Sequence, residues 1–486
     1  MTTPTPSTPR KTLGITGITI NAMALVAPGT FAWMLYQAQA TGEAQGLKGI
    51  WLGVISALLV AFITALSLGE LARRYSSTNL RSAYHFVEQI FRDPARQSGP
   101  AAMRRFSKFV VGWASHVYYW VYPGLLIAFI GIITDYLLRQ LGYSPRPLGQ
   151  VILALAFAAF TGFLALRGIT GSTSSSIILN TMQLASLVAF SIFAILFRVL
   201  NPLAFAPAGW TYASVMGALF SANLKGVIFQ AALGMLLMVG FESVTSLGAQ
   251  AKNPRRDIPI ASIMALVIQG IAAYFLVYFA SGLAFNNQIA PAASSAPLGD
   301  LALQVGDAVL GGNGFSLMFV VAFAVCISLI GALLTATNNG VRISFSMGLD
   351  AEMPDLLGIL NPKYATPYFT VVALCVVSAV IGSAAMLGGL PVLLGLILAS
   401  NIGAFLLYAI LCVLTVIAFY RSSEFHILRH GFVPVLGLAL NLFLALAAPL
   451  VALSAGGITA QAAMVALAVL GLWLVLSILY YFMRRP

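Results

Sequence analysis

The chain has 486 residues, of which 60% are hydrophobic and only 8% are charged. Soluble globular proteins carry roughly 25% charged residues, so this composition excludes a soluble protein and predicts an integral membrane protein. The net charge of +12 would suggest a nucleic-acid partner for a soluble chain. Here the charge has to be read along the membrane topology, and the expected partner is the lipid bilayer, with no nucleic acid.

Residues 1–11 are rich in Thr and Pro and lack an apolar core, which predicts a cytoplasmic tail rather than a cleaved signal. Apolar runs long enough to cross roughly 30 Å of hydrocarbon predict twelve transmembrane helices. They lie at 13–39, 50–72, 109–138, 150–166, 176–199, 226–249, 260–285, 315–339, 368–386, 390–419, 432–453 and 461–483.

The basic residues predict the orientation of these helices. With this topology, 20 of the 25 Lys and Arg residues lie on the side of the N-terminus. Positive charge gathers on the cytoplasmic side of membrane proteins. We therefore expect a multi-pass protein of the cell inner or plasma membrane, with both termini in the cytoplasm.

The first span carries Ala27-Pro28-Gly29-Thr30 at its middle. Proline removes a backbone donor and glycine lowers the cost of unwinding, so this sequence predicts either a proline kink or a complete break. After the second span, the sequence predicts an amphipathic helix, which lies on the cytoplasmic surface or packs under the bundle as part of an inner gate. Its apolar face would comprise Leu80, Tyr84, Val87 and Phe91, and its polar face Arg81, His85, Glu88 and Arg92.

The third span contains Tyr118, Tyr119 and Tyr122, which either pack or line a cavity, because buried hydroxyls need partners. The fifth span carries the amide of Gln183 and the eighth the hydroxyl of Ser328. Residues 286–313 are expected to form an external loop suited to a lid, and the last four spans are largely featureless aliphatic helices. Two histidines four apart in 424–430 have metal-ligand spacing, but a solvated loop is the preferred interpretation, and no metal or cofactor is expected.

The sixth span, unlike the others, combines a glycine and an acid where the bilayer is deepest. Gly240 offers a place to open the helix, and Glu242 is an ionisable residue inside the membrane, which is costly and usually functional. The interruptions at Pro28 and Gly240 each begin a block of five spans. Paired interruptions at matching positions are typical of transporters built from repeats, and an odd number of spans requires the second block to be inverted.

The predicted fold is therefore an all-α membrane protein of twelve helices, with a five-plus-five inverted repeat and broken helices 1 and 6. The expected organisation is a tail at 1–11, a first repeat at 12–200, a second repeat at 201–420 and two further helices at 421–486.

A broken helix exposes amides at one half-helix and carbonyls at the other, which gives a positive and a negative pole. An amino acid carries one charge of each sign. Its carboxylate could be held by the amides of Gly29 and Thr30, and its ammonium by carbonyls around 237–239. The candidate substrate-binding residues are Ala27, Pro28, Gly29, Thr30, Tyr118, Tyr119, Leu236, Leu237, Met238, Val239, Gly240 and Phe241.

The segment Val239-Gly-Phe-Glu-Ser-Val-Thr-Ser, followed by Ala251-Lys-Asn-Pro-Arg-Arg-Asp-Ile-Pro259, resembles the sixth-helix signature of the amino acid, polyamine and organocation transporter superfamily. Ala27-Pro-Gly-Thr-Phe31 and Gly112-Trp113 are similar to its amino acid permease and putrescine-importer branch. The resemblance covers nearly the whole chain. It implies the inverted repeat, alternating access without ATP, and import or exchange of amino acids or amines coupled to protons or sodium.

Three positions depart from the family pattern. Residues 76–83 lack the proline and paired glycines that relatives often carry there, Gln183 stands where many relatives place a lysine, and Tyr118 aligns with an acid of the putrescine importers. Proton coupling through that lysine is therefore not available, and a diamine would lose one counter-ion, which is costly for a buried ammonium.

These observations leave two questions open. Glu242 is either a proton carrier or a group with a structural or gating role, with Gln183 as a second gating candidate, and Ser328 could contribute to a sodium site. The predicted function is a secondary transporter for a small amino acid or amine. A transporter-like receptor that binds a ligand without moving it is the alternative, and an enzyme is not expected.

Overall fold

The computed structural model describes residues 13–25, 33, 36–37, 50–75, 84–92, 101–144, 147–167, 173–201, 224–248, 250–276, 294–364, 366–420 and 422–483. These residues are almost entirely helical, and their one β-type contact is an isolated bridge between Leu13 and Ala251. Eleven of the described helical segments are long and apolar enough to cross a membrane. The prediction of an all-α, multi-pass membrane fold is confirmed.

The membrane-spanning helices match the predicted spans closely. They are α3 (Ile50–Tyr75), α5 (Ala101–Gln140), α6 (Pro147–Leu166), α7 (Thr173–Leu200), the interrupted α9 (Leu224–Gly234) with η2 (Met235–Leu237) and η3 (Phe241–Leu247), α10 (Pro254–Leu276), α12 (Gly314–Leu349), α13 (Tyr368–Leu387), α14 (Gly389–Phe419), η6 (Ile427–Phe432) with α15 (Val433–Ala455), and α16 (Gly457–Met483). Of the predicted first span, the structure describes α1 (Ile15–Leu25) and residues 13, 14, 33, 36 and 37, so this span is not among the eleven.

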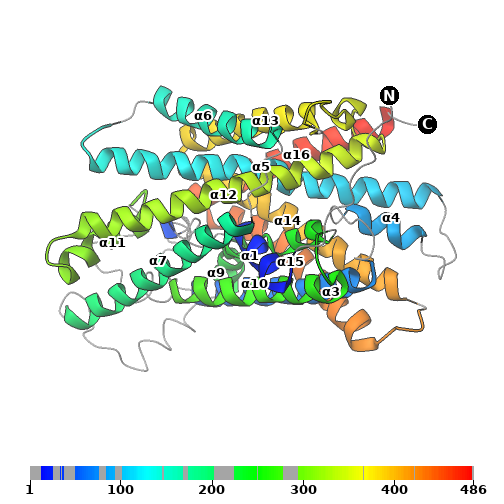
Figure 1. Cartoon of the computed structure of the whole chain (residues 1–486), viewed down its shortest axis with the longest axis horizontal. Helices are drawn as coiled ribbons and strands as arrows, with labels where there is room; N and C mark the ends of the chain where they lie inside the picture. The colour runs from blue at the N-terminus through cyan, green and yellow to red at the C-terminus, as the bar shows by residue number, and fades with distance from the viewer. Residues whose placement is uncertain are drawn as a thin grey trace.

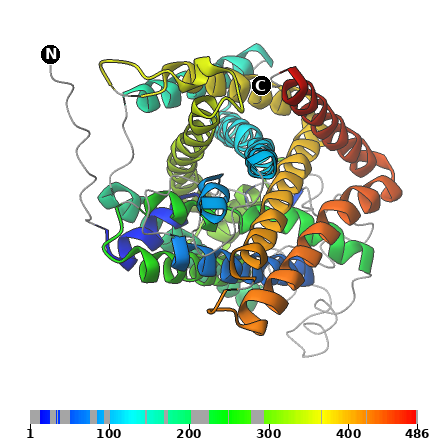
Figure 2. The same ribbon diagram turned by 90° about the vertical axis from the view of Figure 1, so that its right-hand side faces the viewer.

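The long helices run side by side, with α6 and α13 along one edge and α3 and α10 along the other (Figure 1). Viewed end-on, α5 lies inside the bundle, while α15 and α16 lie at its side (Figure 2). Burial follows this arrangement. In the apolar stretch of Leu224–Thr245, 94% of the residues are buried, whereas in the apolar stretch of α16 only 22% are buried. The interrupted helix is therefore at the centre, and α16 faces lipid.

Small residues allow the central helices to approach each other. A Cβ added at Gly124 of α5 would lie 2.5 Å from Ile381, and one added at Gly382 of α13 would lie 2.7 Å from Ile127. Close packing at small residues is the main attraction between helices in lipid, where the hydrophobic effect between them is absent.

The structure differs from the sequence prediction in three places. A helix, α11 (Pro297–Val309), occupies part of the predicted lid loop, and its buried residues recur with helical spacing. The eighth span continues past residue 339 as part of α12, because a helix leaving the hydrocarbon no longer has to be apolar. Residues 424–429 are exposed, as predicted for a solvated segment, but His430 is 1% exposed and stacks on Phe419 at 3.7 Å, so the prediction of a solvated loop was wrong at His430.

Candidate functional site

The sixth span is interrupted at 238–240, as the sequence predicted. The helix α9 tightens into η2, a turn follows, and the chain resumes as η3. Gly240 has φ of +122°, a backbone conformation that residues with a Cβ rarely adopt. The glycine is therefore required by the break itself.

The break leaves backbone carbonyls without helical partners. The amides of Met238 and Val239 both donate to the carbonyl of Met235, and the amide of Ser243 donates to that of Gly240. In the described part of the chain, no backbone N–H donates to the carbonyls of 237–239. Because Leu237, Met238 and Val239 are all buried, these oxygens form a negative pole inside the protein that can accept hydrogen bonds from an ammonium group.

Glu242 is 3% exposed and accepts three hydrogen bonds. Tyr119 of α5 donates its hydroxyl to Oε1 at 3.1 Å. Tyr408 of α14 donates to Oε2 at 2.8 Å, and the amide of Gly240 donates to the same oxygen at 3.0 Å. The carboxylate thus joins three helices and holds the amide of the residue with positive φ, which fixes the geometry of the break.

Tyr408 also packs its ring on Phe241, with the ring centroids 5.0 Å apart. On the other side of the break, Asn401 of α14 donates its side-chain amide to the carbonyl of Ala232 at 2.7 Å. One face of α14 therefore supports both sides of the interruption. This corrects the prediction that the tenth span is featureless.

The end of α1 is capped by side chains from two other helices. Tyr122 donates its hydroxyl to the carbonyl of Leu25 at 3.1 Å, and Gln269 of α10 donates its side-chain amide to that of Met23 at 2.7 Å. Carbonyls at a helix end inside a membrane need such partners. The candidate substrate residues at 27–30 follow directly in the sequence but lie outside the described residues.

Tyr118 is fully buried, and its ring lies against those of Tyr119 and Tyr122, at centroid distances of 4.5 and 5.1 Å. Its hydroxyl has no hydrogen-bond partner among the described residues. A buried hydroxyl without a partner is costly. Tyr119 and Tyr122 therefore bond to other helices of the protein, and Tyr118 is the member of this cluster whose hydroxyl finds no partner among the described residues.

The structure brings Gln183 and Ser328 together. The Ser328 hydroxyl on α12 donates to the side-chain oxygen of Gln183 on α7 at 2.5 Å, and both residues are buried. Both helices pack against α1. The pair therefore joins two helices that both contact α1.

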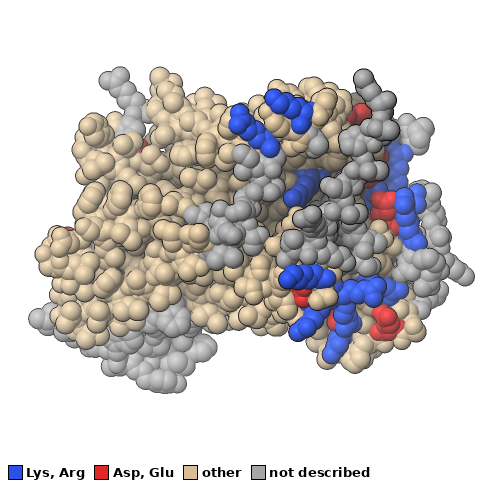
Figure 3. Space-filling model, in the orientation of Figure 1, with Lys and Arg blue, Asp and Glu red and all other residues tan. Residues whose placement is uncertain are grey.

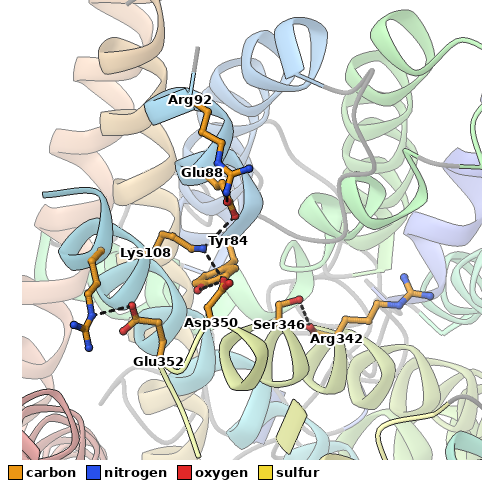
Figure 4. A network of polar contacts seen from close by, with 9 residues as sticks. Tyr84, Glu88, Arg92, Lys108, Arg342, Ser346, Asp350 and Glu352 are labelled. Atoms are coloured by element: carbon orange, nitrogen blue, oxygen red, sulfur yellow. Dashed lines mark hydrogen bonds and ion pairs between the residues drawn. The ribbon is translucent and has the colours of Figure 1, made fainter. Parts of the chain in front are cut away.

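A network of charged groups closes the ends of α4 (Tyr84–Arg92), α5 and α12 (Figure 4). The ammonium of Lys108 lies 2.6 Å from Asp350 and 3.1 Å from Glu88, and Tyr84 donates its hydroxyl to Asp350 at 2.8 Å. Lys108 is only 7% exposed. Tyr84 and Val87 of the predicted apolar face are buried, together with Phe86 and Ile90, whereas Leu80 lies outside the described residues. Because α4 contacts α5, α14 and α3, the helix packs against the bundle and does not lie apart from it on the membrane surface.

Burial also affects a neighbouring acid of this network. Glu352 follows α12 and pairs with Arg105 at 3.5 Å. Burial raises the pKa of Glu352 above its ordinary value, while Arg105 and Lys108 act in the opposite direction. The buried acid therefore takes up a proton more readily than a solvated one.

The sequence analysis missed Tyr408, Gln269 and Asn401 as parts of the site. The signal was present, since Asn401 and Tyr408 are polar and seven residues apart in an otherwise apolar run, which places them on one helix face. Only the structure shows which backbone groups they reach.

These features define a class of protein: a multi-pass helical membrane protein with an interrupted helix at its centre and polar groups gathered around the interruption. A family model described as amino acid permease matches residues 11–483. The chain therefore belongs to the amino acid permease family, within the amino acid, polyamine and organocation superfamily that the sequence resembles.

Similar curated proteins share about a quarter of their residues with this chain. The vacuolar cationic amino acid transporter 4 of Arabidopsis thaliana is 25% identical over 379 residues, 75% of this chain and 55% of that protein. The methylthioribose transporter of Bacillus subtilis is 25% identical over 338 residues, with 68% and 64% covered. A branched-chain amino acid permease of Lactococcus lactis is 25% identical over 352 residues, with 69% and 68% covered. The chain thus spans less than two thirds of the first two relatives.

Proposed function

We propose that the chain is a secondary transporter that carries a small amino acid or amine across the cell membrane by alternating access, with both termini in the cytoplasm. The interrupted helix at 238–240 is the observation that carries this proposal. Its unpaired carbonyls can bind a substrate ammonium without a charged side chain. Residues 27–30 would bind the substrate carboxylate from the matching position of the first repeat.

The favoured substrate is a neutral amino acid with an apolar side chain. Glu242 is the acid beside the break, and its carboxylate already accepts from Tyr119, Tyr408 and Gly240. A second ammonium, as in a diamine, would find no further carboxylate there in the part of the chain described. Buried Leu236, Leu237 and Met238 suit an apolar side chain.

Glu242 acts in this proposal as a brace for the break. Its oxygens accept from one backbone amide and two hydroxyls, a donor set that holds the carboxyl group in place without any change of its protonation during the cycle. Coupling to a proton or to sodium would then reside elsewhere, and Ser328 with Gln183 beside α1 is the candidate place. The charged network around Lys108 would form the inner gate.

Solute counterflow in proteoliposomes tests the function without an assumption about the coupling ion. Vesicles containing the purified chain are loaded with an unlabelled solute and diluted into the same solute carrying a radiolabel. Separate arms use leucine, lysine, putrescine and methylthioribose. We expect transient accumulation of labelled leucine.

Absence of exchange in every arm would refute the transport proposal. If no solute exchanges but one of them still shifts the melting temperature of the purified protein in a saturable way, the receptor alternative is favoured instead. Empty vesicles and vesicles with the Gly240→Ala variant provide the controls.

A further inference from the structure

An apolar groove runs along the outside of the bundle between α6 and α13. It has a volume of about 690 Å³, and the two helices that form it lie along one edge of the molecule (Figure 1). Each helix contributes one face to it, with residues recurring every three or four positions. Its central lining residues are Leu155, Ala158, Gly162 and Phe163 of α6 and Cys375 and Ala379 of α13.

The hollow results from small residues between large ones. Gly162 lies so close to α13 that an added Cβ would be 2.9 Å from the sulfur of Cys375, and Ala158 leaves space beside it. The rims are large and open, since Phe163 is 50% and Val380 63% exposed. In a bilayer this opening faces the acyl chains of lipids, and an apolar groove that excludes water is filled by hydrocarbon.

One end of the groove carries two basic residues. Arg167 follows α6 directly, and its guanidinium lies over the ring of Phe163, 4.4 Å from the centroid. Lys363 lies in the short segment before α13, which is tied to α6 because Thr366 donates its hydroxyl to the carbonyl of Leu166 at 2.9 Å. Within the described ranges, neither Arg167 nor Lys363 forms an ion pair with an acid.

Figure 3 shows basic side chains at the top of the molecule, on the edge formed by α6 and α13 in Figure 1. They are separate from the larger group of charged side chains at the right of the same view. Both residues lie on the side that the positive-inside rule assigns to the cytoplasm. The cytoplasmic leaflet is rich in anionic lipids, which attract basic residues at the membrane surface. A guanidinium binds phosphate through two parallel hydrogen bonds, and an ammonium adds a point charge.

We propose that this groove is a binding site for one anionic phospholipid. An acyl chain fills the hollow between α6 and α13, and the phosphate is held by Arg167 and Lys363. Since α6 is the fourth span of the first predicted repeat and α13 the fourth span of the second, the lipid joins the two halves of the bundle from outside. This site is independent of the substrate site at the broken helix.

Native mass spectrometry of the full chain in detergent tests the proposal, with phosphatidylglycerol as the probe. We expect one phosphatidylglycerol to bind saturably, and phosphatidylcholine to bind much more weakly. The double variant Arg167→Gln/Lys363→Gln should weaken binding about 30-fold, on the basis of the attraction of two basic residues to an anionic surface. The control Arg255→Gln/Arg256→Gln removes two exposed cations elsewhere and should leave binding unchanged.

The acyl-chain part of the proposal has its own variant. Ala159→Phe fills the groove from an exposed position and should abolish phosphatidylglycerol binding while the protein remains folded, as checked by its melting temperature. Inorganic phosphate should not displace the lipid. Equal binding of the two lipids, unchanged binding in the double variant or in Ala159→Phe, displacement by phosphate alone, or occupation of the groove by a second copy of the chain would each overturn the proposal.

Discussion

The role of Glu242 can be tested by comparing substitutions that remove different numbers of its hydrogen bonds. Tyr408→Phe removes one donor, at 2.8 Å, but keeps the ring packing on Phe241. A hydrogen bond to a charged group contributes about 1.5–3 kcal/mol. Glu242→Ala removes the acceptor of all three hydrogen bonds. It leaves the hydroxyls of Tyr119 and Tyr408 and the amide of Gly240 buried without that acceptor.

Glu242→Gln separates a structural brace from a proton carrier. Glutamine keeps one oxygen to accept from the Gly240 amide, and its own amide can donate to a tyrosine oxygen, so most of the geometry remains. We expect the wild type to have the highest melting temperature, followed by Glu242→Gln, then Tyr408→Phe, and Glu242→Ala to have the lowest. Tyr408→Phe should lower the free energy of unfolding by about 2 kcal/mol. The assay is the melting temperature in detergent together with leucine uptake into proteoliposomes at several pH values.

The brace interpretation predicts that uptake by Glu242→Gln keeps the pH dependence of the wild type, with a reduced rate. Loss of the pH dependence at an unchanged melting temperature would refute it. That result would make Glu242 a proton carrier, because glutamine preserves the shape and the hydrogen bonds but cannot exchange a proton.

The other predictions concern the break and the inner network. Gly240→Ala should destabilise the protein by about 1–3 kcal/mol and abolish uptake, because the φ of +122° at this position is unfavourable for alanine. The control is Gly471→Ala on the lipid face, which should be harmless because an added Cβ there has nothing within 4 Å. Equal melting temperatures for the two variants would contradict the requirement for glycine at residue 240. Lys108→Gln leaves Asp350 and Glu88 without their shared cation. In the background of Ser346→Cys, this change should speed the reaction of residue 346 with a thiol reagent added on the cytoplasmic side about 5- to 100-fold. Arg92→Gln, which removes an exposed pair with Glu88, is the matched control and should change little; the same labelling rate in both variants would exclude Lys108 from the gate. Glu352→Gln should raise the melting temperature at neutral pH, since burial raises the pKa of Glu352 and the ionised form is the less stable one in the folded protein. This advantage should shrink as the pH is lowered and the wild-type acid becomes protonated, and an advantage that grows toward acid pH would contradict the sign.

The sequence predicted the helices well because hydropathy determines which segments enter a bilayer. The boundaries of α3 and α13 agree with the predicted spans within a few residues. The eighth span was predicted to end at residue 339, where the polar residues Asn338 and Asn339 end the apolar run, but α12 continues to Leu349. In this last part of the helix the hydroxyl of Ser346 bonds back to the carbonyl of Arg342 at 2.9 Å. Helix ends outside the hydrocarbon are set by local packing, which hydropathy does not report.

The site was predictable in its centre and not in its surroundings. Gly240 and Glu242 were identified from the cost of a glycine and an acid in the middle of a membrane span. The partners of Glu242 were not, because Tyr408 lies 166 residues away in sequence and spacing within one helix carries no information about contacts between helices. Gln183 and Ser328 were identified separately, and only their contact across α7 and α12 makes them one feature.

The central claim, that the substrate binds at the break in the sixth span, is tested most directly by a cysteine placed in it. Met238 is fully buried in the described protein, and Met238→Cys would present a thiol beside the unpaired carbonyls. Purified protein is treated with N-ethylmaleimide, and modification of residue 238 is followed by peptide mass spectrometry with and without the solute identified by counterflow. We predict that saturating solute slows this modification at least tenfold while modification of Cys326 is unchanged. An equal rate of modification at residue 238 with and without solute would contradict the claim.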